Sequence, residues 1–371
     1  MNTLIVFLIL MLTRFVVSQT DKNTHGNISD WRPLHGTIDE RDFMGKKSLS
    51  LSRGLAVLEN SAFTNGTIEV DIAPMNPGLS GIAFHIDENV NYNETYIRYS
   101  KSGGPDALQY SAVWNGEFSW QLYPEYQAAV RFTPNEWIHL KIVVEGYRAA
   151  VFVNADTIAL KIDSLRIPNS AGKIGLWTLA PAYFANLVIT PSAGNTAIHD
   201  DSFRRIVTDN PLAIHEWLVS EPFEFSVEKI SEVDRTLIEK GKWIAARTEP
   251  DGLLNICRFT KKRIAGRTRE NSNDVVWLRY EWTEEADGIK PFSFDYVNRC
   301  AIFLNGRKQF SGMNTFLLKG ALYRGDIDKK MRGNTLHLPV VKGKNSLMIA
   351  VAHITNGWGF IGGFADAGSV N

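Results

Sequence analysis

The chain has 371 residues, a length that suits two domains better than one sandwich, and hydrophobic residues make up 44% of it, as in folded proteins. Its 40 basic side chains balance 40 acidic ones. This balance gives no field that would attract nucleic acid or an anionic membrane surface, so we expect neither as a partner.

The first element is an apolar N-terminal run. Residues 4–13 are almost wholly apolar, Arg14 interrupts the run, and a short stretch ending near Ser18 and Gln19 follows. This pattern predicts a secretory signal peptide over residues 1–19, with an uncleaved anchor as the alternative. No later run approaches the roughly 20 apolar residues that span a bilayer. We expect a protein that is secreted, periplasmic or held at the cell surface, with no membrane insertion after signal cleavage.

Short apolar runs with a period of two follow through residues 30–195, separated by Asn-Gly, Pro-Gly and Gly-Gly pairs. Alternation of this kind between turn signals predicts an antiparallel β-sandwich. In chain order, the expected strands cover residues 68–72, 82–86, 95–99, 108–114, 137–144, 149–153 and 183–190.

A linker and a second β-rich domain complete the chain. Residues 191–201 (PSAGNTAIHDD) are small, polar and unpatterned, which places the boundary near Asn195. Residues 203–371 form the second domain, with one helix expected between Ser226 and Lys240, a tight turn at Asn305-Gly306 and a hairpin turning at Gly343-Lys344. Its expected strands cover residues 217–219, 243–247, 254–259, 275–282, 301–304, 335–339 and 346–353. The prediction is an all-β protein of two consecutive antiparallel β-sandwich, or jelly-roll, domains.

Several segments carry resemblances to known families. FTNGTIEVDI (63–72), GIAFH (81–85), NEWIHLK (135–141) and GKIGLW (172–177) resemble the concanavalin A-like lectin/glucanase jelly roll, especially its laminin-G-like and 3-keto-disaccharide-hydrolase-like branch. VNRCAIFLNGR (297–307) and LHLPVVKGKNSLMIAV (336–351) look like a galactose-binding-like domain. The first resemblance implies a concave sheet face that receives sugars.

Polar and aromatic side chains on the first domain's strands are the candidate ligand contacts. Alternation puts polar residues of neighbouring strands on shared faces, and sugar sites combine such groups with aromatic rings. If these faces coincide, the concave surface is lined by His85, Asp87, Tyr96, Arg98 and Gln109, with Trp114 and Trp120 flanking the Asn115-Gly116 turn. The alternative is a polar sheet face that is simply solvated.

Two carboxylates, Glu69 and Asp71, are the candidate acid/base groups and complete the expected ligand-binding set. The Glu-x-Asp-x-x-Glu pattern of retaining endoglucanases is incomplete, because Pro74 stands where the second glutamate belongs. A solvated sheet face is the ordinary explanation of such residues. In a glycoside-cleaving enzyme, they and His85 would exchange protons with the substrate.

These observations predict an exported protein that binds a polysaccharide or oligosaccharide on the first domain. The alternatives are a glycoside hydrolase of the keto-disaccharide-hydrolase-like type and a non-catalytic cell-surface scaffold. We expect no cofactor, since zinc-type spacings and phosphate-binding glycine loops are missing from the sequence. A structural calcium ion is left open, as is the choice between a disulfide and two buried thiols for Cys257 and Cys300.

Overall fold

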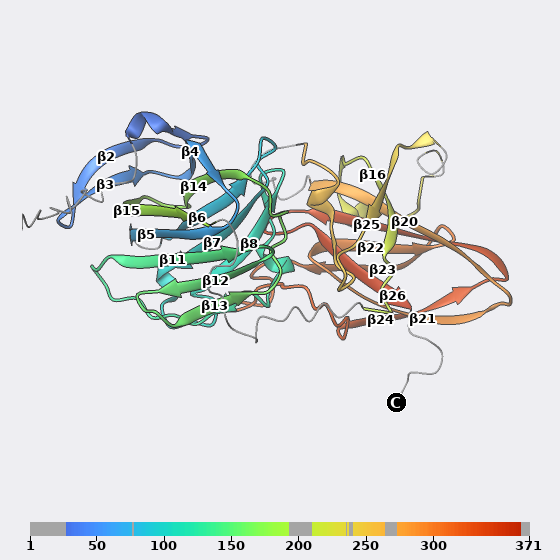
Figure 1. Cartoon of the computed structure of the whole chain (residues 1–371). Helices are drawn as coiled ribbons and strands as arrows, with labels where there is room; N and C mark the ends of the chain where they lie inside the picture. The colour runs from blue at the N-terminus through green and yellow to red at the C-terminus, as the bar shows by residue number, and fades with distance from the viewer. Residues whose placement is uncertain are drawn as a thin grey trace, which may run out of the picture.

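The computed structural model describes residues 27–75, 78–192, 210–234, 236, 240–263 and 273–364. Within them the chain forms four antiparallel sheets, arranged as two sandwich domains that lie side by side (Figure 1). The predicted all-β class with two sandwiches is confirmed. The predicted signal peptide and the boundary near Asn195 lie outside the described residues. No helix in the described part of the chain is long and apolar enough to cross a membrane.

The first sandwich consists of sheets A and B. Sheet A has the order β1-β4-β14-β6-β7-β8-β10 with β9 paired to β8, and sheet B has the order β13-β12-β11-β5-β15-β3-β2. Sheet A contains β1 (Trp31–Pro33), β4 (Gly54–Phe63), β6 (Leu79–Ile86), β7 (Tyr92–Arg98), β8 (Leu108–Trp114), β9 (Glu117–Phe118), β10 (Gln127–Ala128) and β14 (Gly172–Thr178). Sheet B contains β2 (Ile38–Phe43), β3 (Lys46–Leu51), β5 (Gly66–Pro74), β11 (Ile138–Glu145), β12 (Arg148–Val153), β13 (Ile158–Ile162) and β15 (Ala182–Pro191). Single 3-10 turns occur at η1 (Ile28–Asp30), η2 (Tyr99–Lys101) and η3 (Trp120–Leu122).

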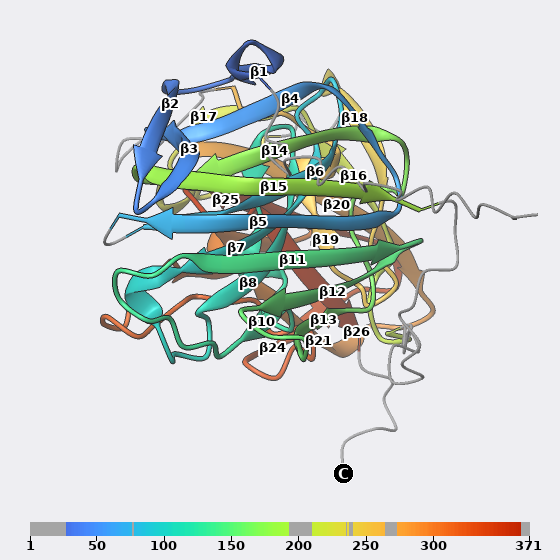
Figure 2. The ribbon, with the colours of Figure 1, turned by 60° about the vertical axis from the view of Figure 1, so that its left-hand side comes forward.

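Alternation along the strands decides which residues enter the core. In β11 every second residue, from Ile138 to Val144, is buried, and the residues between them are partly exposed. Side chains of this kind fill the space between sheets A and B. Sheet B presents its other face to the outside, whereas the other face of sheet A is turned toward the second sandwich (Figure 2).

The second sandwich consists of sheets C and D. Sheet D has the order β18-β16-β20-β25-β22-β23 with β17 paired to β20, and sheet C has the order β19-β26-β21-β24. Sheet D contains β16 (Glu216–Ser220), β17 (Phe223–Phe225), β18 (Trp243–Arg247), β20 (Asn273–Glu284), β22 (Asn298–Leu304), β23 (Arg307–Asn314) and β25 (Gly343–His353). Sheet C contains β19 (Leu254–Asn255), β21 (Gly288–Tyr296), β24 (Asn334–Val340) and β26 (Gly359–Phe364), and 3-10 turns occur at η5 (Val227–Lys229) and η6 (Ile256–Arg258).

Two local expectations for the second domain are wrong. The predicted hairpin at Gly343-Lys344 does not form, because β24 pairs with β21 in sheet C while β25 pairs with β20 and β22 in sheet D. The turn therefore carries the chain from one layer to the other. The strand expected over 254–259 ends at Asn255 and continues as η6.

A third expectation is confirmed, and a fourth lies only partly within the described residues. The turn at Asn305-Gly306 is confirmed: both residues have positive φ, +49° and +81°, and they join β22 to β23. The helix expected between Ser226 and Lys240 falls partly outside the described residues. Its described portion contains η5 and helical conformation at Thr236 and Lys240.

The two sandwiches share a hydrophobic cluster. Leu122 and Tyr123 of the first domain belong to the same buried cluster as Ile327 and Met331 of the second. The backbone of Gly359 approaches Leu122 so closely that an added Cβ would lie 2.4 Å from Leu122 Cδ2. The domains are therefore tightly packed against each other rather than loosely linked.

Candidate functional site

His85 lies inside the first sandwich. Ala83 pairs with Gly175 and Ile86 with Lys173, so two residues of β6 stand opposite a single residue of β14. This β-bulge, at which His85 has a φ of +57°, breaks the alternation and turns the ring inward. The expectation that His85 lines the concave face is therefore wrong.

The buried His85 ring has two polar neighbours. Its Nε2 lies 2.8 Å from the Thr64 carbonyl oxygen and its Nδ1 lies 3.0 Å from Asn93 Nδ2. Burial lowers the pKa of His85. A neutral ring that donates from Nε2 and accepts at Nδ1 satisfies both contacts, so His85 has a structural role here.

Glu69 and Asp71 lie on the outer face of sheet B, on the opposite surface from the predicted sugar face. His139 stands between them, with Nδ1 2.8 Å from Asp71 Oδ1 and Nε2 3.3 Å from Glu69 Oε2. Asp71 also accepts hydrogen bonds from Lys46 at 2.6 Å and Asn186 at 2.7 Å. Burial raises the pKa of Asp71, but these hydrogen bonds outweigh it and bring the value to about 2. The expectation that both carboxylates share one trough with Tyr96 is therefore wrong.

Tyr96, Arg98 and Gln109 do share the outer face of sheet A. Tyr96 pairs with Gln109 on β8, and its hydroxyl donates to Gln109 Oε1 at 2.9 Å. Arg98, two residues further along β7, forms an ion pair with Asp106. Trp177 adds an aromatic ring whose centre is 5.4 Å from that of Tyr96. Asp87, by contrast, lies in the turn after β6 and accepts hydrogen bonds from Asn89 and Asn91.

The second domain covers this part of sheet A. Arg324 forms an ion pair with Asp106, its guanidinium carbon lies 4.5 Å from the centre of the Trp120 ring, and its Nε donates to Asp326 at 2.9 Å. Tyr96 is 3% exposed and Gln109 2%. The open trough expected here is therefore filled by protein. We call this cluster the polar seam: Tyr96, Arg98, Asp106, Gln109, Trp120, Gln121, Gln127, Arg324 and Asp326.

Trp114 and Trp120 lie apart. Trp120 belongs to the polar seam, whereas Trp114 packs against the cores of both domains beside Arg258, whose guanidinium carbon is 5.6 Å from the ring centre. Of the four residues expected to converge, His85, Arg98, Trp114 and Trp120, only Arg98 and Trp120 belong to one cluster, in which Asp106 and Arg324 connect them.

Several polar atoms of the polar seam are buried without a hydrogen-bond partner among the described residues. They are the donors Arg324 Nη2 and Gln127 Nε2 and the acceptors Asp326 Oδ1 and Gln121 Oε1. Gln127 joins this set because it pairs with Gln109 across β8 and β10. Buried polar atoms are almost always satisfied in folded proteins, by protein, water or a ligand. Hydroxyl groups, which both donate and accept, are the kind of group that can satisfy these two donors and two acceptors.

Glu94 is a second unusual group on this face. It stands on β7 between Tyr92 and Tyr96, opposite Ala83 and Ser111. Its side chain is fully buried, and neither carboxyl oxygen has a partner in the described part of the chain. Burial raises the pKa of Glu94 well above its usual range, which favours the neutral, protonated form of the acid.

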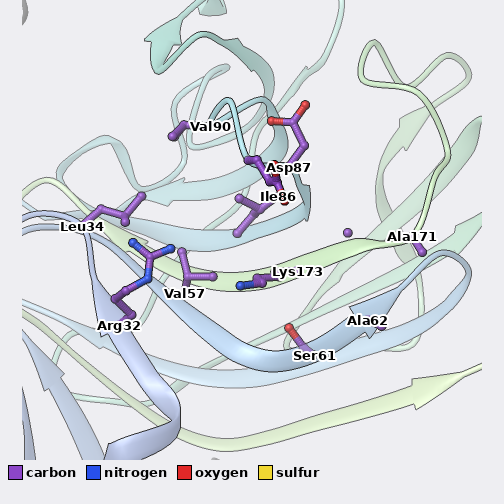
Figure 3. A pocket seen from close by; sticks show the side chains of 12 residues that line it. Arg32, Leu34, Val57, Ser61, Ala62, Ile86, Asp87, Val90, Ala171 and Lys173 are labelled. Atoms are coloured by element: carbon purple, nitrogen blue, oxygen red, sulfur yellow. The ribbon is translucent and has the colours of Figure 1, made fainter.

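An open pocket of about 550 Å³ lies on the same face of sheet A, at the edge formed by β1, β4, β6 and β14 (Figure 3). Val57 and Ile86 contribute apolar surface, and Arg32 and Lys173 each pair with Glu59 at its border. Val57 and Glu94 stand in one cross-strand row, three strand spacings or roughly 14 Å apart. The pocket and Glu94 therefore lie on one face of sheet A, with β14 and β6 between Val57 and Glu94.

The described residues hold two buried cysteines and no metal-binding cluster. They contain no group of three or more His, Cys, Asp or Glu side chains arranged to hold a metal ion. Cys257 and Cys300 are both free and buried, which decides the open question in favour of two thiols. Burial raises the pKa of each thiol, so neither is a ready nucleophile.

Comparisons with known proteins concern the first domain. Residues 21–190 match the model of the 3-keto-alpha-glucoside-1,2-lyase-like domain. The first domain is thus a jelly roll similar to that carbohydrate-active family, as its sequence resemblance implied, and the second domain has no assignment. No curated protein sequence matches the chain.

Solved structures with a similar first domain include three bacterial proteins. The carbohydrate binding module CBM66 from Bacillus subtilis is 22% identical, over 43% of this chain and 95% of its own, with a TM-score of 0.34. The Bacillus licheniformis beta-glucanase is 14% identical, over 46% and 96%, with a TM-score of 0.33. A Bacillus subtilis protein of unknown function with a galectin-like fold is 13% identical, over 45% and 92%, with a TM-score of 0.34.

Proposed function

We propose that this is an exported protein that binds a saccharide at the polar seam, on the outer face of sheet A. The observation that carries the proposal is the set of four unpartnered polar atoms, two donors and two acceptors, buried in the polar seam. A pair of neighbouring sugar hydroxyls offers two O–H donors and two acceptor oxygens, which complements this set.

Two further features support a saccharide ligand. Trp120 and Tyr96 supply aromatic rings beside the polar atoms, the combination that sugar rings require. The similarity of residues 21–190 to a carbohydrate-active family points to the same ligand class. The second domain resembles galactose-binding-like modules in sequence, and we propose that it belongs to that kind of module.

The test is saccharide binding by the full chain. A panel of neutral oligosaccharides and polysaccharides is screened on an array, and the best ligand is measured by calorimetry. Gln127→Leu removes an unpartnered donor without breaking a known bond, so we expect weaker binding by about tenfold and undiminished stability. Glu69→Gln, on the opposite sheet, is the matched control and retains full binding. A folded protein that retains no saccharide would contradict the proposal and favour the scaffold alternative.

One observation favours glycoside cleavage as a second candidate function. Glu94 is a buried carboxylic acid on the proposed sugar face, and burial raises its pKa and so favours the protonated form that a general acid needs in order to protonate a leaving group. Release of reducing ends from the same panel measures cleavage. We expect Glu94→Gln to abolish it and the double variant Glu69→Gln, Asp71→Asn to leave it intact. Equal activity of the Glu94 variant and the wild type would remove Glu94 from the mechanism.

A further inference from the structure

We infer that the second domain supplies a ligand-binding residue, Arg324, so that the saccharide site is shared between the two sandwiches and is selective for uncharged sugars. This inference rests on the proposed function. Arg324 belongs to the segment 315–333, which joins β23 to β24 and lies against the outer face of sheet A.

Arg324 is held in place before any ligand binds. Its side chain contacts Asp106, Asp326 and the ring of Trp120, and its carbonyl oxygen accepts a hydrogen bond from Gln121 Nε2 at 2.6 Å. These contacts fix the guanidinium plane, while Nη2 is buried with no partner within the described ranges. Because the guanidinium group is already fixed, Nη2 can donate a hydrogen bond to a ligand with little further loss of side-chain entropy.

The charges of the polar seam set the class of ligand. Arg98 and Arg324 balance Asp106 and Asp326, so the cluster carries no excess positive charge for an anionic sugar. A uronic acid would bring an unpaired carboxylate into a buried site, which is strongly unfavourable. Hydroxyl groups add no charge and can satisfy the free donors and acceptors. The geometry therefore fits a neutral saccharide.

Burial of the polar seam has a consequence for ligand entry. Tyr96 and Gln109 are almost fully covered, so a saccharide reaches them only when the segment 315–333 moves outward and takes Arg324 with it, and Arg324 regains the contacts described above when the segment closes on the ligand. The segment is also tied down beyond Arg324. Ile327 N donates to the Gln121 carbonyl oxygen at 2.9 Å, and Lys329 pairs with Glu125 of the first domain at 2.7 Å. The open pocket lies on the same face of sheet A but at its other edge, formed by β1, β4, β6 and β14.

The experiment measures binding of the best neutral saccharide by full-length variants. Arg324→Lys keeps the charge but removes the planar fork, and we expect its affinity to fall by about tenfold or more. Lys329→Met is the matched control, because Lys329 lies in the same segment and also pairs across the domain boundary, yet contacts none of the unpartnered atoms. We expect its affinity to stay within about twofold of the wild type. A uronic-acid analogue of the ligand should bind at least about tenfold more weakly than the neutral sugar.

Each outcome decides a separate point. If the wild type binds and Gln127→Leu weakens binding while Arg324→Lys does not, the inference is overturned and the proposed function stands. An equal loss in Lys329→Met and Arg324→Lys also overturns it, because domain contact alone would then explain both. Equal affinity for the neutral and acidic sugars contradicts the selectivity. A folded wild type that binds no saccharide defeats the proposed function and the inference together.

Discussion

The guanidinium carbon of Arg324 in the second domain lies 4.5 Å from the centre of the Trp120 ring in the first. This contact places the domain boundary and the proposed saccharide site at the same position. Binding of a saccharide at the proposed site would therefore be coupled to domain packing, and a substitution at the boundary has to be assessed for both.

We expect substitution of Arg166 to lower the stability of the protein more than substitution of any other charged residue. Its Nη1 lies 2.8 Å from Glu249 Oε2, and Tyr123 donates to the other oxygen of Glu249 at 2.7 Å, so a buried network joins the domains. Arg166→Met leaves the Glu249 carboxylate buried without its cation, and we expect the free energy of unfolding to fall by about 3–5 kcal/mol. Urea denaturation measures the change.

An exposed ion pair provides the comparison for Arg166. Arg332 donates to Asp328 at 2.8 Å, but its side chain is 73% exposed. Arg332→Met should leave the midpoint of urea denaturation close to that of the wild type, because solvent screens an exposed pair. Similar losses of stability in Arg166→Met and Arg332→Met would show that the buried network stabilises the protein no more than an exposed ion pair does.

His139 should make stability depend on pH. The hydrogen bond to Asp71 raises the pKa of His139 above its usual 6.5, so the folded protein holds a proton that the unfolded chain releases. The resulting stabilisation is complete below pH 6.5 and is lost as the pH rises through the raised pKa. We expect His139→Gln to be less stable than the wild type at about pH 5.5 and to lose less stability toward about pH 8.5, measured by denaturation across that range. A constant difference between the two proteins at all pH values would exclude this role.

Glu94 should destabilise the protein as the pH rises. Burial raises the pKa of Glu94 above its usual 4.5, so above that pH the unfolded chain releases a proton that the folded protein retains. Stability associated with Glu94 is therefore greatest below pH 4.5 and declines at higher pH. Glu94→Gln removes this dependence, and thermal unfolding should show its advantage over the wild type growing from about pH 4 to about pH 8. An advantage that shrinks over this range would contradict the burial of a neutral acid.

Gly81 should not accept a side chain. In sheet A, Gly81 of β6 pairs with Tyr96 of β7 on one side and with Trp177 of β14 on the other. An added Cβ would lie 2.1 Å from the Thr95 carbonyl oxygen. Gly81→Ala must push β6 and β7 apart, and we expect a loss of about 1–3 kcal/mol or more together with weaker saccharide binding. Gly333→Ala is the control, since no atom lies within 4 Å of its added Cβ. Thermal unfolding of both variants checks the prediction, which is wrong if they have the same melting temperature.

Much of the fold follows from local sequence pattern. The alternation in β11 and the Asn305-Gly306 turn have local physical causes, and both appear as predicted. Tyr96, Arg98 and Gln109 were placed on one face for the same reason. The same alternation placed His85 on that face, and this prediction is wrong, because a single extra residue in β6 reverses the direction of every later side chain and no residue type indicates such a bulge.

The candidate site was harder to predict because it joins distant parts of the chain. Alternation places Glu69 and Asp71 on one face of their strand, but it does not say which sheet of the sandwich that strand joins. Glu94 was within reach of the sequence, since it alternates with Tyr96 on β7. Arg324 carried no local signal, because its contacts with Asp106 and Trp120 arise only when the two sandwiches meet.

The hydrophobic cluster that crosses the domain boundary also determines how the chain can be divided. In the first sandwich produced alone, Leu122 and Tyr123 would lose the cover that Ile327 and Met331 give them. A newly wetted apolar patch of this kind promotes self-association. We therefore expect the isolated jelly roll to be poorly soluble, so that it cannot be transplanted as a free-standing module.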